Sequence, residues 1–209
     1  MCFISSILLL RNNSTKYWKY FILYLATTVT IESYSFVANR CLFLNIDTQW
    51  LYNIFLLIYM VFHIYIFYKI INIHYIKNIC IFCLLLLLGF YGWEFYNIGF
   101  LKYFSRTNTM FSGVVILLSI LYYYSLFKHE EIKDIMCEPA FWFVSGCLIF
   151  YVTSSVTNAF FKEIIEYSRQ NTFPLRYVIM NFLNIIMYGC WIKSFICLHK
   201  AQVSSAHSS

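Results

Sequence analysis

The feature that most constrains this chain is a series of long apolar runs that are nearly free of charge. Residues 50–71, for example, read WLYNIFLLIYMVFHIYIFYKII, in which Lys69 is the one lysine or arginine and no acidic residue occurs. A helix rises 1.5 Å per residue, so about 20 residues are needed to cross a hydrocarbon core of about 30 Å. Six runs have this length: 17–38, 50–71, 77–97, 108–127, 139–161 and 175–198. The sequence therefore predicts an all-α, polytopic transmembrane helix bundle with six full spans.

Composition supports a membrane protein. Charged residues make up 11% of the chain, whereas soluble domains carry about 25%. Glycine and proline, the helix breakers, occur only 6 and 2 times. The apolar runs are continuous and do not alternate with polar residues, as the strands of a transmembrane barrel would.

The ends of the chain differ from its middle. Residues 1–10, MCFISSILLL, predict a short N-terminal apolar stub, because ten helical residues cover only about half a bilayer. Residues 201–209, AQVSSAHSS, are small and polar and predict a disordered tail. Residues 1–200 are expected to form a single transmembrane helical domain, in which Pro139 and Pro174 mark the starts of the last two spans.

The basic residues indicate an orientation. With six spans, nine Lys and Arg residues fall on one side of the membrane and six on the other. The positive-inside rule then predicts an integral protein of the cell (inner) membrane with a cytoplasmic C-terminus. The same residues are scattered singly between apolar runs and form no patch, so no nucleic-acid binding is expected.

Polar side chains gather in the predicted outer halves of the spans. Buried in hydrocarbon without partners, such groups would cost several kcal/mol each. They predict a hydrated, outward-opening ligand pocket formed by residues from separate helices: Thr28, Glu32, Asn53, Ser112, Ser154, Asn158, Asn181 and Asn184. The alternative is that they are interhelical glue, bonding neighbouring helices or their own backbone.

Two ionisable residues are candidates for chemistry. Intramembrane carboxylates are costly and usually functional, so Glu32 either lines a cavity or is a protonated structural hydrogen-bonder. His63 is either a packed hydrogen-bonder or shares a water with Glu32 in a proton relay. His63 lacks a second histidine three or four residues away, so neither a metal nor another cofactor is expected. No nucleophile–base pair or phosphate loop is visible, and we expect no enzyme activity.

Three stretches carry a resemblance: LYNIFLLIYMVFHIYIFYK, EPAFWFVSGCLIFYVTS and NIIMYGCWIKSF. They resemble bacterial multi-span integral membrane proteins of the seven-helix sensor type, found alone or joined to histidine kinases. In that group a carboxylate–proline pair followed by aromatic residues opens the fifth full span. This chain matches the pattern at Glu138, Pro139, Phe141 and Trp142. The chain departs from the group in its shortened first helix and in having no kinase after residue 198. The resemblance implies output through a separate partner, such as a histidine kinase in trans.

These observations favour an integral membrane sensor or receptor-like module. A small molecule or lipid in the pocket would bias helix packing through different affinities for two states. A small-solute transporter is one alternative, although Gly/Pro-interrupted helices and a paired repeat, both usual in transporters, are not visible. A membrane scaffold or assembly subunit is another.

Overall fold

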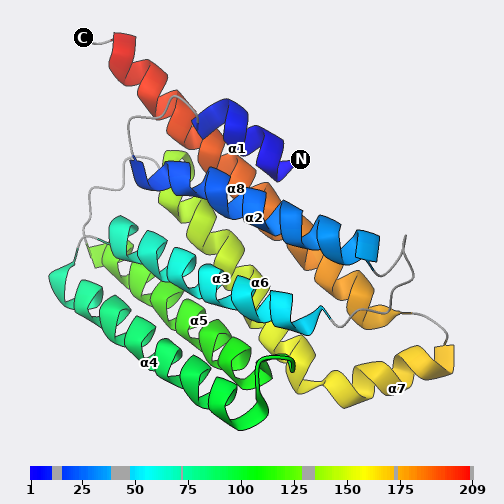
Figure 1. The fold of residues 1–209 in the computed structure, drawn as a ribbon. Coiled ribbons are helices and arrows are strands. Elements are labelled where there is room, and N and C mark those ends of the chain that lie inside the picture. Colours follow the sequence, from blue (N-terminus) through cyan, green and yellow to red (C-terminus); the bar gives the residue numbers. More distant parts are fainter. Residues whose placement is uncertain (11–15, 39–47, 72, 129–134, 172–173, 208–209) are drawn as a thin grey trace. The chain divides into compact units, whose positions relative to one another are not determined.

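The chain is all-α throughout the residues that the computed structural model describes, 1–10, 16–38, 48–71, 73–128, 135–171 and 174–207 (Figure 1). In order, the elements are α1 (Cys2–Leu10), α2 (Lys16–Phe36), α3 (Gln49–Ile70), α4 (His74–Ile98), α5 (Ser105–Lys128), the 3-10 turn η2 (Ile135–Cys137), α6 (Pro139–Ala159), α7 (Phe161–Asn171) and α8 (Leu175–His207).

Five of these helices, not six, are long and apolar enough to span a membrane. Within the described ranges they are α3, α4, α5, α6 and α8. The prediction of a span at 17–38 is wrong by this measure. The corresponding helix, α2, has the required length, but it contains two lysines, Glu32 and five serine and threonine residues. These side chains lower its hydropathy below that of the other long helices.

The structure also differs from the sequence prediction at two places in the C-terminal third of the chain. α7 was not predicted as an element and fills most of the connection between α6 and α8. α8 continues to His207, whereas the sequence predicted a disordered tail from residue 201. No proline follows Pro174 and no glycine follows Gly189, and Ala201 and Gln202 are good helix formers, so nothing stops the helix. Residues 208–209 lie outside the described ranges.

The helices group into two compact parts, Phe3–Phe111 and Ser112–Ser209, with the boundary inside α5. In the first part, α3 packs against α2 and α4. α2 and α3 are antiparallel, because Tyr20 contacts Tyr65 while Tyr24 contacts Phe62. α4 ends at Gly99, whose φ of 73° is easily adopted without a side chain.

In the second part, α6 and α8 form the most extensive helix pair. They are antiparallel, since Phe143 contacts Trp191 and the Ser194 hydroxyl donates to the Pro139 carbonyl oxygen at 2.7 Å. The helices approach most closely at Gly146, where an added Cβ would lie 2.8 Å from Cys190 Cβ. A glycine at this crossing allows the two backbones to meet, as small residues do in membrane helix pairs.

Candidate functional site

Asn53 joins α3 to the chain between α4 and α5. Its side chain is fully buried. The Nδ2 group donates to the carbonyl oxygens of Phe100 and Lys102, both at 2.8 Å, and Oδ1 accepts from the Phe104 backbone N–H at 3.0 Å. One side chain thus makes hydrogen bonds to three backbone groups of the loop, which lie outside the helices and have no partner in a helix.

Glu94 performs a related task at the start of α5. The carboxylate is 3% exposed and accepts from the Arg106 backbone N–H at 3.1 Å and from the Thr107 backbone N–H at 2.8 Å. It also accepts from the Thr107 hydroxyl at 2.7 Å. The first N–H groups of a helix have no partner in the helix, and the dipole favours a negative charge there. A carboxylate on α4 therefore caps α5.

The other predicted residues of the first part occupy different surroundings. Thr28 donates to the Tyr24 carbonyl oxygen of its own helix at 2.9 Å, and Glu32 is exposed. His63 is fully buried, with its ring against Tyr24 and Tyr59, and its Nδ1 lies 3.0 Å from the Tyr59 carbonyl oxygen. Tyr24 is the residue of α2 that contacts His63, and Glu32 lies about two turns, or about 12 Å, further along the same helix. The proton relay stays a prediction.

The second part contains the remaining members of the predicted pocket. Ser112 and Ser154 are buried, Asn184 is half-buried, and Asn158 and Asn181 are exposed. Asn158 Oδ1 accepts from Arg176 Nη2 at 3.3 Å, which joins α6 to α8. The predicted pocket draws on both parts of the chain, so it stays a prediction as a whole.

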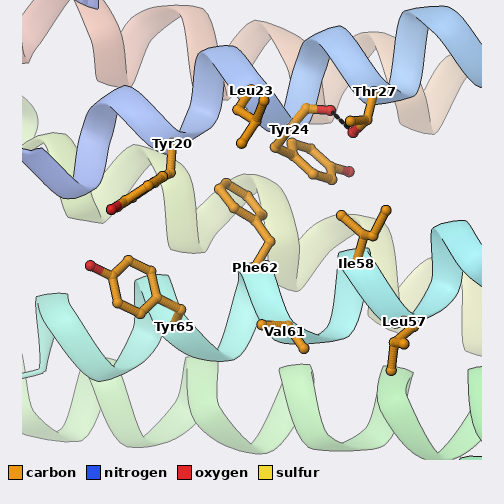
Figure 2. Close-up of a pocket in the computed structure, with 9 residues that line it drawn as sticks. All are labelled: Tyr20, Leu23, Tyr24, Thr27, Leu57, Ile58, Val61, Phe62 and Tyr65. Atoms are coloured by element: carbon orange, nitrogen blue, oxygen red, sulfur yellow. Dashed lines mark hydrogen bonds between the residues drawn. The ribbon is translucent and has the colours of Figure 1, made fainter.

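A groove of about 630 Å³ lies between α2 and α3. Tyr24 and Phe62 are buried and form its floor, with their rings stacked 4.2 Å apart at an interplanar angle of 3°. The walls belong to both helices and, apart from Thr27, are apolar or aromatic (Figure 2): Tyr20, Leu23, Thr27, Leu57, Ile58, Val61 and Tyr65. The volume lies within the range of small-molecule sites, about 300–1,000 Å³.

The two ends of the groove differ chemically. Figure 2 shows the hydroxyls of Tyr20 and Tyr65 at one end, and it shows Thr27, Leu57 and the hydroxyl of Tyr24 toward the other. The Tyr20 and Tyr65 rings are 5.6 Å apart, edge to face. Lys69, one turn beyond Tyr65, holds its ammonium 5.6 Å from the centre of the Tyr65 ring. The Thr27 hydroxyl, in contrast, donates to the Tyr24 carbonyl oxygen of its own helix at 2.7 Å.

Basic residues continue past the tyrosine end of the groove. The ammonium groups of Lys69 and Lys77 lie 5.7 and 5.6 Å from the centre of the Tyr68 ring. Lys19, next to Tyr20, is exposed. Positive charges therefore follow the groove beyond Tyr20 and Tyr65, where two tyrosine hydroxyls lie together.

The groove was not among the sites predicted from the sequence. The signal was present as aromatic residues three or four positions apart on both helices, at Tyr17, Tyr20 and Tyr24 and at Tyr59, Phe62 and Tyr65. This spacing places the rings on one face of each helix. It does not reveal that the two faces leave a hollow where they meet.

The five apolar helices define the class of protein: a candidate multi-pass helical membrane protein with a lipid bilayer as its surroundings. No protein-family model, no curated protein sequence and no solved structure matches the chain significantly. The resemblance to seven-helix sensors thus stays a prediction. Among the described residues, no three His, Cys, Asp or Glu side chains gather closely enough to hold a metal ion.

Proposed function

We propose that the chain is a receptor-like membrane module that binds an acidic lipid in the groove between α2 and α3. The observation that carries the proposal is the chemical order along the groove: an aromatic floor, an apolar wall, two tyrosine hydroxyls and then Lys69. An acyl chain would lie along the floor, and a carboxylate or phosphate would lie at the tyrosine end.

The position of the groove favours a ligand that comes from the bilayer. Its α3 residues run from Leu57 to Tyr65 and so occupy the middle of a candidate span that extends from Gln49 to Ile70. Leu23 and Val61 on its rim are 64% and 44% exposed. At this depth the protein is surrounded by acyl chains and not by water. An acyl chain that leaves the groove therefore enters other acyl chains and gains no hydration.

The tyrosine end favours an acidic head group. Tyrosine hydroxyls donate hydrogen bonds, and the ammonium of lysine is a strongly hydrated point charge that pairs with carboxylate or phosphate. Near a membrane surface, each basic residue contributes about 1 kcal/mol to attraction of anionic lipid. A lipid that holds α2 and α3 together would act as a signal if a second arrangement of the two helices bound it less well.

Thermal unfolding of the purified protein in a mild non-ionic detergent tests this proposal. Oleate and oleyl alcohol serve as probes, because they share a chain and differ in charge. Oleate at about 100 times its Kd should stabilise the protein by about 2.7 kcal/mol, while oleyl alcohol should give a smaller shift at the same concentration. Inorganic phosphate alone should give no shift, since it lacks the chain.

Two variants locate the effect. Val61→Trp fills the groove and should abolish the oleate shift, and Lys69→Gln should bring the response to oleate close to that to oleyl alcohol. Val152→Trp on α6 is the matched control, because Val152 is 41% exposed and lies outside the groove. An oleate shift that survives Val61→Trp, or equal shifts for oleate and oleyl alcohol, would refute the proposal.

A further inference from the structure

α7 has two chemically different faces. At 3.6 residues per turn, Phe161, Ile164, Ile165 and Ser168 fall within about 100° of its circumference. Glu163 and Glu166 lie on the opposite side. Tyr167 and Arg169 border the apolar face. The helix is about 16 Å long.

The apolar face of α7 is only partly covered by the described chain. Ile165 and Tyr167 are 46% and 52% exposed, and Phe161 is also exposed. In water this would be an unfavourable surface, because apolar area costs about 25 cal/mol per Å² left in contact with water. The apolar face of α7 therefore needs a cover that the described chain does not provide in full.

The neighbours of α7 fix its level relative to a bilayer. α7 directly follows α6 and precedes α8, both of which are candidate spans. Figure 1 shows that α7 turns away from the line of α6 instead of continuing it. Because α6 and α8 are antiparallel, the segment that joins them lies at one surface of the membrane. Tyrosine is typical of that level, and Tyr167 and Tyr177 are exposed around the segment.

Two contacts hold α7 against the start of α8. The Leu175 backbone N–H donates to the Ser168 hydroxyl at 3.3 Å. The Arg176 guanidinium lies 4.7 Å from the centre of the Phe161 ring. The same guanidinium donates to Asn158 Oδ1 at 3.3 Å. These contacts constrain the orientation of the helix about its own axis: Phe161 and Ser168 lie toward the start of α8, while Ile165 on the same face stays 46% exposed.

We propose that α7 is an interfacial helix that lies in the membrane surface, with Ile164 and Ile165 among the upper acyl chains and Glu163 and Glu166 among the head groups. Its sequence, FKEIIEYSRQN, contains two acidic and two basic residues. The interaction thus rests on apolar burial and needs no anionic lipid. This inference is independent of the groove between α2 and α3.

Site-specific photo-crosslinking of the full chain tests the orientation of α7. The photoreactive residue p-benzoylphenylalanine replaces Ile165 in one variant and Glu166 in another, and both proteins are reconstituted in phosphatidylcholine vesicles. The two positions are matched, because both are exposed and adjacent on the same helix. After illumination, mass spectrometry should detect several-fold more lipid adduct at position 165 than at position 166. Adding phosphatidylglycerol should not change that ratio.

Several results would overturn the inference. Equal lipid yields at the two positions would place α7 outside the membrane surface. Crosslinks from position 165 mainly to protein would mean that a second copy, or another segment of the chain, covers the apolar face. A ratio that appears only with phosphatidylglycerol would mean that charge, not apolar burial, holds the helix.

Discussion

The replacement of Asn53 by alanine tests how the polar residues near the helix ends stabilise this fold. The substitution removes the acceptor of the buried Phe104 N–H and the donors to the Phe100 and Lys102 carbonyl oxygens. A buried N–H without a partner costs about 1–3 kcal/mol, and each lost net hydrogen bond costs about 0.5–1.5 kcal/mol. Because water can reach part of the exposed loop, we expect a total loss of about 2–4 kcal/mol.

Thermal unfolding in mild detergent, followed with a maleimide dye that reacts with exposed thiols, measures this loss. Cys80 and Cys83 are buried on α4 and should react only when the helices separate. For a chain of this size, about 2–4 kcal/mol corresponds to a fall in Tm of roughly 5–15 °C.

The matched control is Asn97→Ala. Asn97 is also an asparagine of the first part, but it is exposed and its Nδ2 donates to the Trp93 carbonyl oxygen of its own helix at 2.7 Å. Its replacement should change the free energy of unfolding by less than about 0.5 kcal/mol. If Asn53→Ala and Asn97→Ala have the same Tm, the hydrogen bonds of Asn53 do not stabilise the loop and the reasoning fails.

Two further substitutions probe helix ends and helix packing by the same assay. Glu94→Gln keeps the shape of the side chain but turns one acceptor toward the start of α5 into a donor, so it should cost about 1–3 kcal/mol. Glu138→Gln is its control, because no side-chain hydrogen bond caps α6, and it should leave Tm nearly unchanged. Gly146→Ala places a Cβ 2.8 Å from Cys190 Cβ and should cost about 1–3 kcal/mol. Gly189→Ala is the control: no atom lies within 4 Å of the new Cβ, and the substitution should be neutral or slightly stabilising. A Gly146→Ala protein as stable as this control would contradict the close packing of α6 and α8.

Apolar length and helix-breaking residues predicted most of the helices. α6 begins at Pro139 and α8 directly follows Pro174, as expected from the prolines. The prediction of a span at 17–38 was wrong, because a helix must be apolar as well as long to count as a candidate span. The hydroxyls and Glu32 make α2 less apolar than its neighbours. α7 was missed because its apolar residues are few and spaced at a helical period within a short connection, not gathered in a run.

The tertiary partners of polar residues were harder to predict. Asn53 stood out in the sequence as an asparagine in an apolar run, but its partners are backbone groups of Phe100, Lys102 and Phe104, and no side-chain pattern marks a backbone partner. The groove likewise depends on which faces of α2 and α3 meet. Periodicity gives the face of one helix, whereas the meeting of two faces is a property of the folded chain.

The central claim is that an acidic lipid occupies the groove between α2 and α3, and an experimental density map of the protein in nanodiscs containing phosphatidylglycerol tests it most directly. The account predicts continuous density for an acyl chain beside Leu23 and Val61, ending in a head group near Tyr65 and Lys69. A groove closed by its own side chains, or filled by a helix of another protein chain, would contradict the claim.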